Sequence, residues 1–272
     1  MKMTETFKTF KPKNPVVARY VDYYYLDIKP DNAIREFECF PHFNNTVSFY
    51  QSHLITSEGS IQYEQNGHYL QVFTPIRENI LYVKQLGMIH RIAIVFNPLG
   101  IQQFYSNLTI DYPTSDFEFL TASETAPLFT TEDTSVLCGL LDGYLSSRYQ
   151  EYRNDMVSQA IQYIFDAPET LSIEILAEKL QLSRRHLTRI FKAHFGISVQ
   201  KFQKIVLFRK TLQHKLFDPT HNSFTSLAHE HNFSDQAHFN KMFVKFTHHS
   251  PKQFLKKGTH LGTEDTFWHL LE

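Results

Sequence analysis

The chain has 272 residues, of which 42% are hydrophobic and 15% aromatic, and its net charge is −1. This length is sufficient for two domains, and this composition for a core in each. No stretch approaches the roughly 18 apolar residues of a membrane-spanning helix, and the N-terminus lacks an apolar signal-peptide region. Cys39 and Cys138 lie far apart without Cys-x-x-Cys spacing, which excludes a cysteine-based zinc site. We therefore expect a cytoplasmic protein with no membrane partner.

The charge is distributed unevenly along the chain. Residues 1–153 hold 12 Lys and Arg against 17 Asp and Glu, a net charge of −5. Residues 154–257 hold 15 against 8, a net charge of +7, and residues 258–272 hold three acids and no bases. A positively charged region favours a nucleic-acid partner, because it neutralises backbone phosphates.

The N-terminal 150 residues predict a β-rich domain. Residues 1–40 suggest irregular structure with an edge strand, despite an aromatic cluster at 20–25. Short β-type runs separated by turn residues then follow at Thr46–Ile55, Ile61–Glu64, Tyr69–Phe73, Ile80–Lys84 and Met88–Phe96. Strands this short and regular suggest a barrel or sandwich, with Asn66-Gly67 as its clearest hairpin turn.

Helical spacing of apolar residues begins after Asn97-Pro98 and is strongest from Thr134 to Tyr149. One apolar stripe at 134–149 allows two interpretations: a dimerisation helix, or a helix that covers the open side of the barrel. A further helix is expected over Asn154–Asp166, which places a domain boundary near residue 150. Because no Gly/Ser-rich linker separates the two halves, we expect them to dock.

The segment from Leu171 to Phe254 contains the same device twice. In the first copy, Ser172 caps a short apolar helix and Ser183 caps a second helix after a tight turn. The second helix directs Leu187, Ile190 and Phe191 inward. Its outward face then carries Arg184, Arg185, Thr188, Arg189 and Lys192.

In the second copy, Ser223 opens a short helix and Ser234 caps the next, whose core stripe is Phe239, Met242, Phe243 and Phe246. The outward residues are Gln236, Ala237, His238, Lys241 and Lys245. One such basic face is often only a solvated helix surface, but two copies predict a paired helix-turn-helix. A helix from Ser198 to Leu216 joins them and spans roughly 28 Å, close to one turn of B-DNA.

These residues resemble the AraC/XylS family of bacterial transcription regulators over about 100 of the 272 residues. The resemblance rests on Ala177, Leu180, Leu182–Lys192, Phe195–Ser198, Asn232–Phe243 and Ser250–Phe254. The chain departs from the family at Val199, where Pro is usual, at Asn232, where Gly is usual, and at His248 or His249, where the family has a Gly. Asn tolerates the left-handed conformation, so Asn232 is compatible with the turn.

The resemblance implies an α+β protein: a cupin-like (jelly-roll) N-terminal domain over 1–150, an all-α domain with two helix-turn-helix units over 151–257, and an acidic tail over 258–272. It implies base reading by Arg185, Thr188, Arg189, Gln236, Ala237, His238 and Lys241. It implies phosphate contacts by Arg184, Lys192, Asn240 and Lys245. The implied partners are promoter DNA, RNA polymerase, a small-molecule effector of the N-terminal domain and a second copy of the chain.

The sequence predicts no catalytic site, no cofactor and no metal. Of the 15 histidines, only His42, His53, His68 and His90 lie in the expected barrel, without the His-x-His pair of metal-binding cupins. His229 and His231 flank a helix end, where one such pair is more often incidental. The alternative interpretation is a cupin-type enzyme or small-molecule binding module whose helical half contacts another protein.

Overall fold

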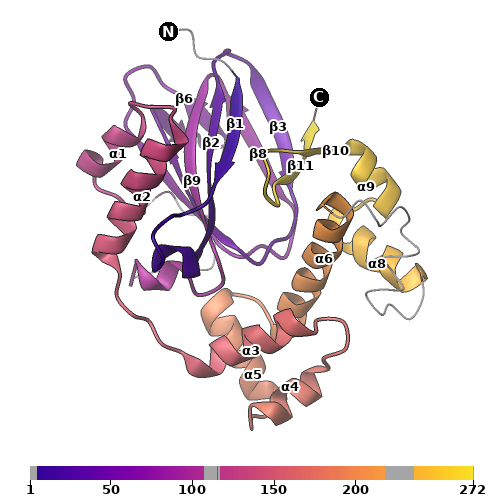
Figure 1. The fold of residues 1–272 in the computed structure, drawn as a ribbon. Helices are drawn as coiled ribbons and strands as arrows, with labels where there is room; N and C mark the ends of the chain where they lie inside the picture. Colours follow the sequence, from indigo (N-terminus) through magenta and orange to yellow (C-terminus); the bar gives the residue numbers. More distant parts are fainter. Residues whose placement is uncertain (1–4, 107–114, 116, 218–235, 272) are drawn as a thin grey trace.

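The structure of the protein is a computed structural model, and it describes residues 5–106, 115, 117–217 and 236–271, without the side chains of 236–238 (Figure 1). Two β-sheets form the N-terminal half, and helices form the C-terminal half beside them. This confirms the α+β prediction. No helix within these described ranges is both long and apolar enough to cross a membrane.

The first sheet has five strands and the second has six. The order in the first is β1 (Thr6–Phe10), β2 (Val21–Lys29), β9 (Ile89–Phe96), β4 (Asn45–Tyr50) and β7 (Leu70–Thr74). The order in the second is β10 (Gly258–His260), β11 (Phe267–Leu271), β3 (Ile34–Cys39), β8 (Leu81–Leu86), β6 (Ile61–Tyr63) and β5 (His53–Ile55). Neighbouring strands are antiparallel, except that β6 and β8 are parallel.

The first sheet is covered on both faces, so β2 and β9 are buried along almost their whole length. On one face, Tyr24 and Leu26 pack with the helices α1 (Ala122–Leu128) and α2 (Thr134–Arg148). On the other face, Tyr23 and Tyr25 pack with Val95, toward the second sheet. The apolar stripe of α2 therefore covers this sheet from outside, as the second of the two interpretations for 134–149 expected.

Several N-terminal expectations need correction. Residues 1–40 are not mainly irregular, because they supply β1, the nine-residue β2 and β3. The run Thr46–Ile55 is two strands in different sheets, since the chain turns at Ser52 with a φ of 58°. Asn66 does turn, with a φ of 65°, but β6 and β7 lie in different sheets and do not form a hairpin. Within the described residues, 3₁₀ turns lie at η1 (Val17–Arg19) and η2 (Ile101–Gln103).

The prediction of a separate acidic tail over 258–272 is also wrong. Residues Phe267–Leu271 form β11, which pairs with β3, and Gly258–His260 form β10 at its other edge. Trp268 lies opposite Cys39 in this pairing and stacks on Phe37, with ring centroids 4.6 Å apart. Phe267 and Trp268 are buried in the sheet. The free energy gained by burying these two apolar side chains outweighs the preference of the three acids of the segment for solvent.

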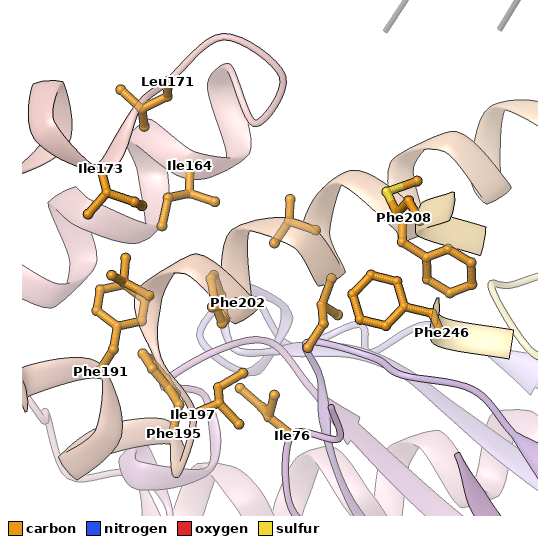
Figure 2. Packing of buried hydrophobic residues seen from close by; sticks show 14 of the residues in the cluster. Ile76, Ile164, Leu171, Ile173, Phe191, Phe195, Ile197, Phe202, Phe208 and Phe246 are labelled. Atoms are coloured by element: carbon orange, nitrogen blue, oxygen red, sulfur yellow. The ribbon is translucent and has the colours of Figure 1, made fainter. Parts of the chain in front are cut away.

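The described helices of the C-terminal half are α3 (Asp155–Asp166), α4 (Ile173–Lys179), α5 (Arg184–Phe195), α6 (Val199–Phe217), α8 (Gln236–Thr247) and α9 (Pro251–Lys257). Their apolar faces form one core, to which the N-terminal half contributes Phe40, Ile76 and Leu99. Figure 2 shows Ile76 beside Ile197 and Phe195 in this core. The two halves are therefore docked, as the missing linker predicted.

Candidate nucleic-acid interface

The first helix-turn-helix is formed by α4 and α5. The hydroxyl of Ser172 accepts a hydrogen bond from the Ile175 amide at 3.1 Å, and that of Ser183 accepts one from the His186 amide at 3.2 Å. Both serines thus satisfy amides that a helix start leaves unpaired. Between the helices, Gln181 adopts a φ of 54°, and α5 ends at Gly196 with a φ of 72°. The predicted caps of both helices are confirmed.

The two faces of α5 differ in the way the spacing predicted. Leu187 and Phe191 are fully buried and Ile190 packs partly against the same core. Arg184, Arg185, Arg189 and Lys192 are exposed, whereas Thr188 is half-buried. This face is therefore a row of cations that solvent, or a phosphate backbone, can reach.

Two of these cations already have protein partners. Arg184 Nη1 lies 2.5 Å from Glu174 Oε1 on α4, in an ion pair exposed on both sides. Arg189 Nη2 lies 3.3 Å from Nδ1 of His186, one turn earlier on the same helix. An exposed ion pair contributes little to stability, so a phosphate can compete for Arg184.

The second unit presents α8 in the same way. Phe239, Phe243 and Phe246 are buried and Met242 nearly so, while Asn240, Lys241 and Lys245 are exposed. The side chains of Gln236, Ala237 and His238, and the expected helix starts at Ser223 and Ser234, lie outside the described residues. His248, after α8, has a φ of 58°, a conformation that favours Gly.

The linker helix α6 holds the two units apart. Its 19 residues give it a length of roughly 28 Å, somewhat less than the roughly 34 Å of one turn of B-DNA. Phe202 packs against Phe191 of α5 at a centroid distance of 5.4 Å, and Phe208 against Phe243 of α8 at 5.2 Å. Figure 2 shows Phe202 and Phe208 at two separate points along this helix. Both α5 and α8 therefore pack against the same helix, α6.

A buried arginine of α6 anchors this helix to the β-sheets. Arg209 donates to the carbonyl oxygens of Pro41 at 2.6 Å and Phe40 at 2.9 Å, and its Nη1 lies 3.3 Å from Asp265. Arg209 stands at a core-facing position of α6 and is only 3% exposed. A charged residue at a core-facing position of a helix indicates a buried polar network, because such a group is buried only when it has partners.

His42 completes this network. Its Nδ1 accepts from the Asn44 amide at 3.0 Å, so the proton resides on Nε2, which faces Asp265 at 3.3 Å. Burial and the Arg209 charge lower the pKa of His42 to about 4. Burial alone would raise the pKa of Asp265, but Arg209 and His42 outweigh it and hold that pKa below its usual value.

A cavity of about 170 Å³ lies between the two sheets, next to this network. Aromatic side chains form much of its wall, and three guanidinium groups reach it, from Arg77, Arg91 and Arg209. Arg91 is ion-paired with Asp27 at 2.6 Å. Arg77 Nε is buried without a hydrogen-bond partner among the described residues. The cavity thus has partly aromatic walls and one buried donor, Arg77 Nε, without a partner among the described residues.

Comparison with known proteins identifies the C-terminal part. The profile of a helix-turn-helix domain family matches residues 176–257. An HTH-type transcriptional regulator of Staphylococcus aureus is 33% identical over 104 residues, covering 37% of this chain and 13% of the relative. The HTH-type transcriptional regulator MtrA of Neisseria gonorrhoeae is 29% identical over 118 residues, covering 43% of this chain and 38% of MtrA. The chain thus spans well under half the length of these relatives.

Among solved structures, ToxT from Vibrio cholerae has a TM-score of 0.49 and 11% identity, with 93% of this chain and 98% of that chain covered. A second ToxT structure, described as bound to an unsaturated fatty acid, has a TM-score of 0.45 and 9% identity, with 89% and 98% covered. The profile match and the paired helices of the fold agree on one assignment. Residues 176–257 of this chain match a helix-turn-helix domain.

Proposed function

We propose that this protein is a sequence-specific DNA-binding transcription regulator that places α5 and α8 in successive major grooves. The observation that carries the proposal is the placement of two recognition helices on one 19-residue helix, within a region of net charge +7. The helix-turn-helix relatives support it. A protein-interaction role for the helical half would not need cations on both recognition helices.

Within this proposal, the side chains on α5 and α8 form two groups: candidates for reading bases and candidates for binding phosphates. Arg185 and Arg189, with Thr188, lie along α5 and are the base-reading candidates of the first unit; Gln236, Ala237, His238 and Lys241 are those of the second. An Arg can fork onto guanine O6 and N7, and a Gln onto adenine N6 and N7. Arg184, Lys192, Asn240 and Lys245 are the phosphate candidates.

The test is binding of the full chain to genomic DNA fragments, followed by a mobility-shift assay on the enriched sequence at several salt concentrations. We expect a specific site of two half-sites about one helical turn apart, and affinity that falls steeply with salt. A folded chain that enriches no sequence above non-specific background would favour the alternative of a protein-interaction module.

The N-terminal cavity supports a second part of the proposal: a small amphipathic effector with an anionic group. Its aromatic walls suit an apolar body, and the unpaired Arg77 Nε suits a carboxylate. Because Arg209 of α6 also reaches this cavity, an occupant would act directly on the helix that carries both recognition helices.

A screen of aliphatic carboxylates against alcohols of equal length tests the effector. We expect thermal stabilisation by the carboxylates only, and its loss in Arg77→Met. Equal effects of acids and alcohols would remove the anionic group from the proposal. Contact with RNA polymerase and self-association belong to the same proposal as expectations of the family, and size-exclusion chromatography with light scattering tests the second.

A further inference from the structure

Three potential metal ligands from different parts of the chain meet where the second sheet contacts the second helix-turn-helix unit. Glu38 lies on β3, His269 on β11, and His249 in the turn between α8 and α9. One ligand atom from each lies within 4.8 Å of the others. Glu38 and His269 are direct partners in the β3–β11 pairing, so the backbone register itself sets their distance.

The hydrogen bonds of His269 determine which of its nitrogens is available. Its Nε2 lies 2.7 Å from the carbonyl oxygen of Phe254, which can only accept, so the ring proton resides on Nε2. The lone pair of Nδ1 then faces Glu38 Oε2, which is 3.4 Å away. Both atoms are buried and lack a hydrogen-bond partner among the described residues. Two acceptors face each other there, which is unfavourable unless a cation lies between them.

The hydrogen bond to the Phe254 carbonyl orients the His269 ring so that Nδ1 is directed at Glu38. A neutral imidazole whose other nitrogen donates to a backbone carbonyl is the usual arrangement of a metal-bound histidine.

We propose that Glu38, His249 and His269 bind a divalent transition-metal ion of the zinc class. Two imidazole nitrogens and a carboxylate oxygen are a common zinc ligand set, with water in the fourth position. Bonds of this type require ligand atoms about 3.4 Å apart. The Glu38–His269 distance already meets this requirement. His249 is only half-buried, and its ring lies tilted against that of His269 at a centroid distance of 5.3 Å, so a small side-chain movement closes the site.

The ion would join the N-terminal sheet to the turn that follows α8. This turn is built around the left-handed His248, so the position of His249 is fixed relative to the end of α8. Metal binding would therefore set the orientation of the second recognition helix against the sheets. This consequence for DNA rests on the proposed function, whereas metal binding itself does not.

Metal binding is tested on tag-free full-length protein after EDTA treatment and desalting. Zinc is titrated in competition with a chromophoric chelator, and Co²⁺ is added separately to record its visible absorption. We expect one equivalent of Zn²⁺ per chain, a Co²⁺ spectrum of nitrogen and oxygen ligation, and a higher melting temperature with Zn²⁺. Folded wild-type protein that binds zinc no more tightly than the variants below would overturn the proposal.

Three variants separate a site from adventitious binding. His249→Ala and Glu38→Gln should each weaken zinc binding by at least the roughly 10–100-fold seen when an outer-shell partner is lost. The matched control is His248→Asn, which removes the exposed neighbouring imidazole while keeping a residue that tolerates a positive φ. It should bind zinc like wild type. Equal losses in His248→Asn and His249→Ala would show surface binding only and also overturn the site. Circular dichroism checks that each variant folds.

The same variants separate this site from the proposed function. If zinc binds with the expected ligands but no DNA sequence is enriched, the metal site stands and the regulator proposal fails. If DNA binds specifically and zinc does not bind, the reverse holds. If both hold, Zn²⁺ should change the DNA affinity of wild type and of His248→Asn, but not that of His249→Ala.

Discussion

The guanidinium of Arg209, in the middle of α6, donates to the carbonyl oxygen of Pro41 at 2.6 Å, just beyond the end of β3. This bond joins the helix that carries both recognition helices to the sheet that lines the cavity. Since Asp265 and the Phe40 carbonyl share the same guanidinium, α6 cannot rotate on the sheets without breaking all three contacts.

Arg209→Met should therefore destabilise the chain by about 3–5 kcal/mol, because it leaves a carboxylate and two carbonyls buried without their partner. Urea unfolding followed by circular dichroism measures the loss. Lys204→Ala, at an exposed position of the same helix, is the control and should change stability by about 0.5 kcal/mol or less. A loss for Arg209→Met as small as the control's would mean that water replaces these contacts.

Arg189 and Lys192 should differ in how they act on DNA. Arg189→Ala should cost about 1–3 kcal/mol and relax preference at one or two base pairs, as expected for a base reader. Lys192→Ala should weaken all sequences similarly and lower the salt slope by about one unit, as for one lost phosphate contact. Neither side chain belongs to the buried stripe, so thermal melts should not change. Binding isotherms on DNA sites with single-base changes distinguish the two effects. If Lys192→Ala alters the base preference and Arg189→Ala does not, α5 faces the DNA about a quarter turn away from the orientation proposed here.

Glu174 should restrain DNA binding through its ion pair with Arg184. Glu174→Gln releases the guanidinium and should raise affinity for all sequences. Glu178→Gln is the control, because it removes the same charge from another exposed position of α4. Filter binding at low and moderate salt measures both, and we expect the larger gain for Glu174→Gln. Equal gains would show that net charge alone matters.

Acid should destabilise the protein through His90. Burial lowers the pKa of His90 to about 4, and the nearby His53 lowers it slightly further. Above pH 6.5 the ring is neutral in both states and its contribution to stability is complete. Between pH 6.5 and 4 only the unfolded chain takes up the proton, so the free energy of unfolding falls by about 1.4 kcal/mol per pH unit for this group. His90→Gln should make the decline shallower in urea unfolding at pH 7, 6 and 5. Parallel curves for both proteins would exclude a neutral buried His90.

Trp268 should report on the cavity, because it is the one tryptophan of the chain and lines that space. Its ring stacks on Phe37, and the Arg91 guanidinium lies 5.1 Å from its centroid. We expect blue-shifted emission that moves to the red on unfolding, and a change in intensity when a carboxylate effector binds. A Trp268 emission maximum typical of exposed indole in the folded state would contradict the β3–β11 pairing.

Local patterns predicted the helical half well. Ser172 and Ser183 cap helices where the sequence placed helix starts, because a cap depends on neighbours within one turn. The exposure of Arg185 and Lys192 followed from helix periodicity for the same reason.

Pairings between distant segments were not predictable in this way. The role of Arg209 depends on Pro41 and Asp265, each far away in the chain, and the cluster of Glu38, His249 and His269 depends on the β3–β11 register. Histidine spacing along the sequence could not show that cluster. The 258–272 segment was misjudged because its acids are local and its pairing partner is not. Whether the base-reading and phosphate residues contact DNA stays a prediction.

The pairing of β11 with β3 also has a consequence for synthesis. A ribosome makes β3 and β8 early, but the strand that covers the outer edge of β3 emerges only after the entire helical half. A nonsense mutation anywhere between Gln203 and Lys257 would leave that edge open. An uncovered strand edge is a template for intermolecular pairing. Such truncations should therefore accumulate as aggregates rather than as free N-terminal domains.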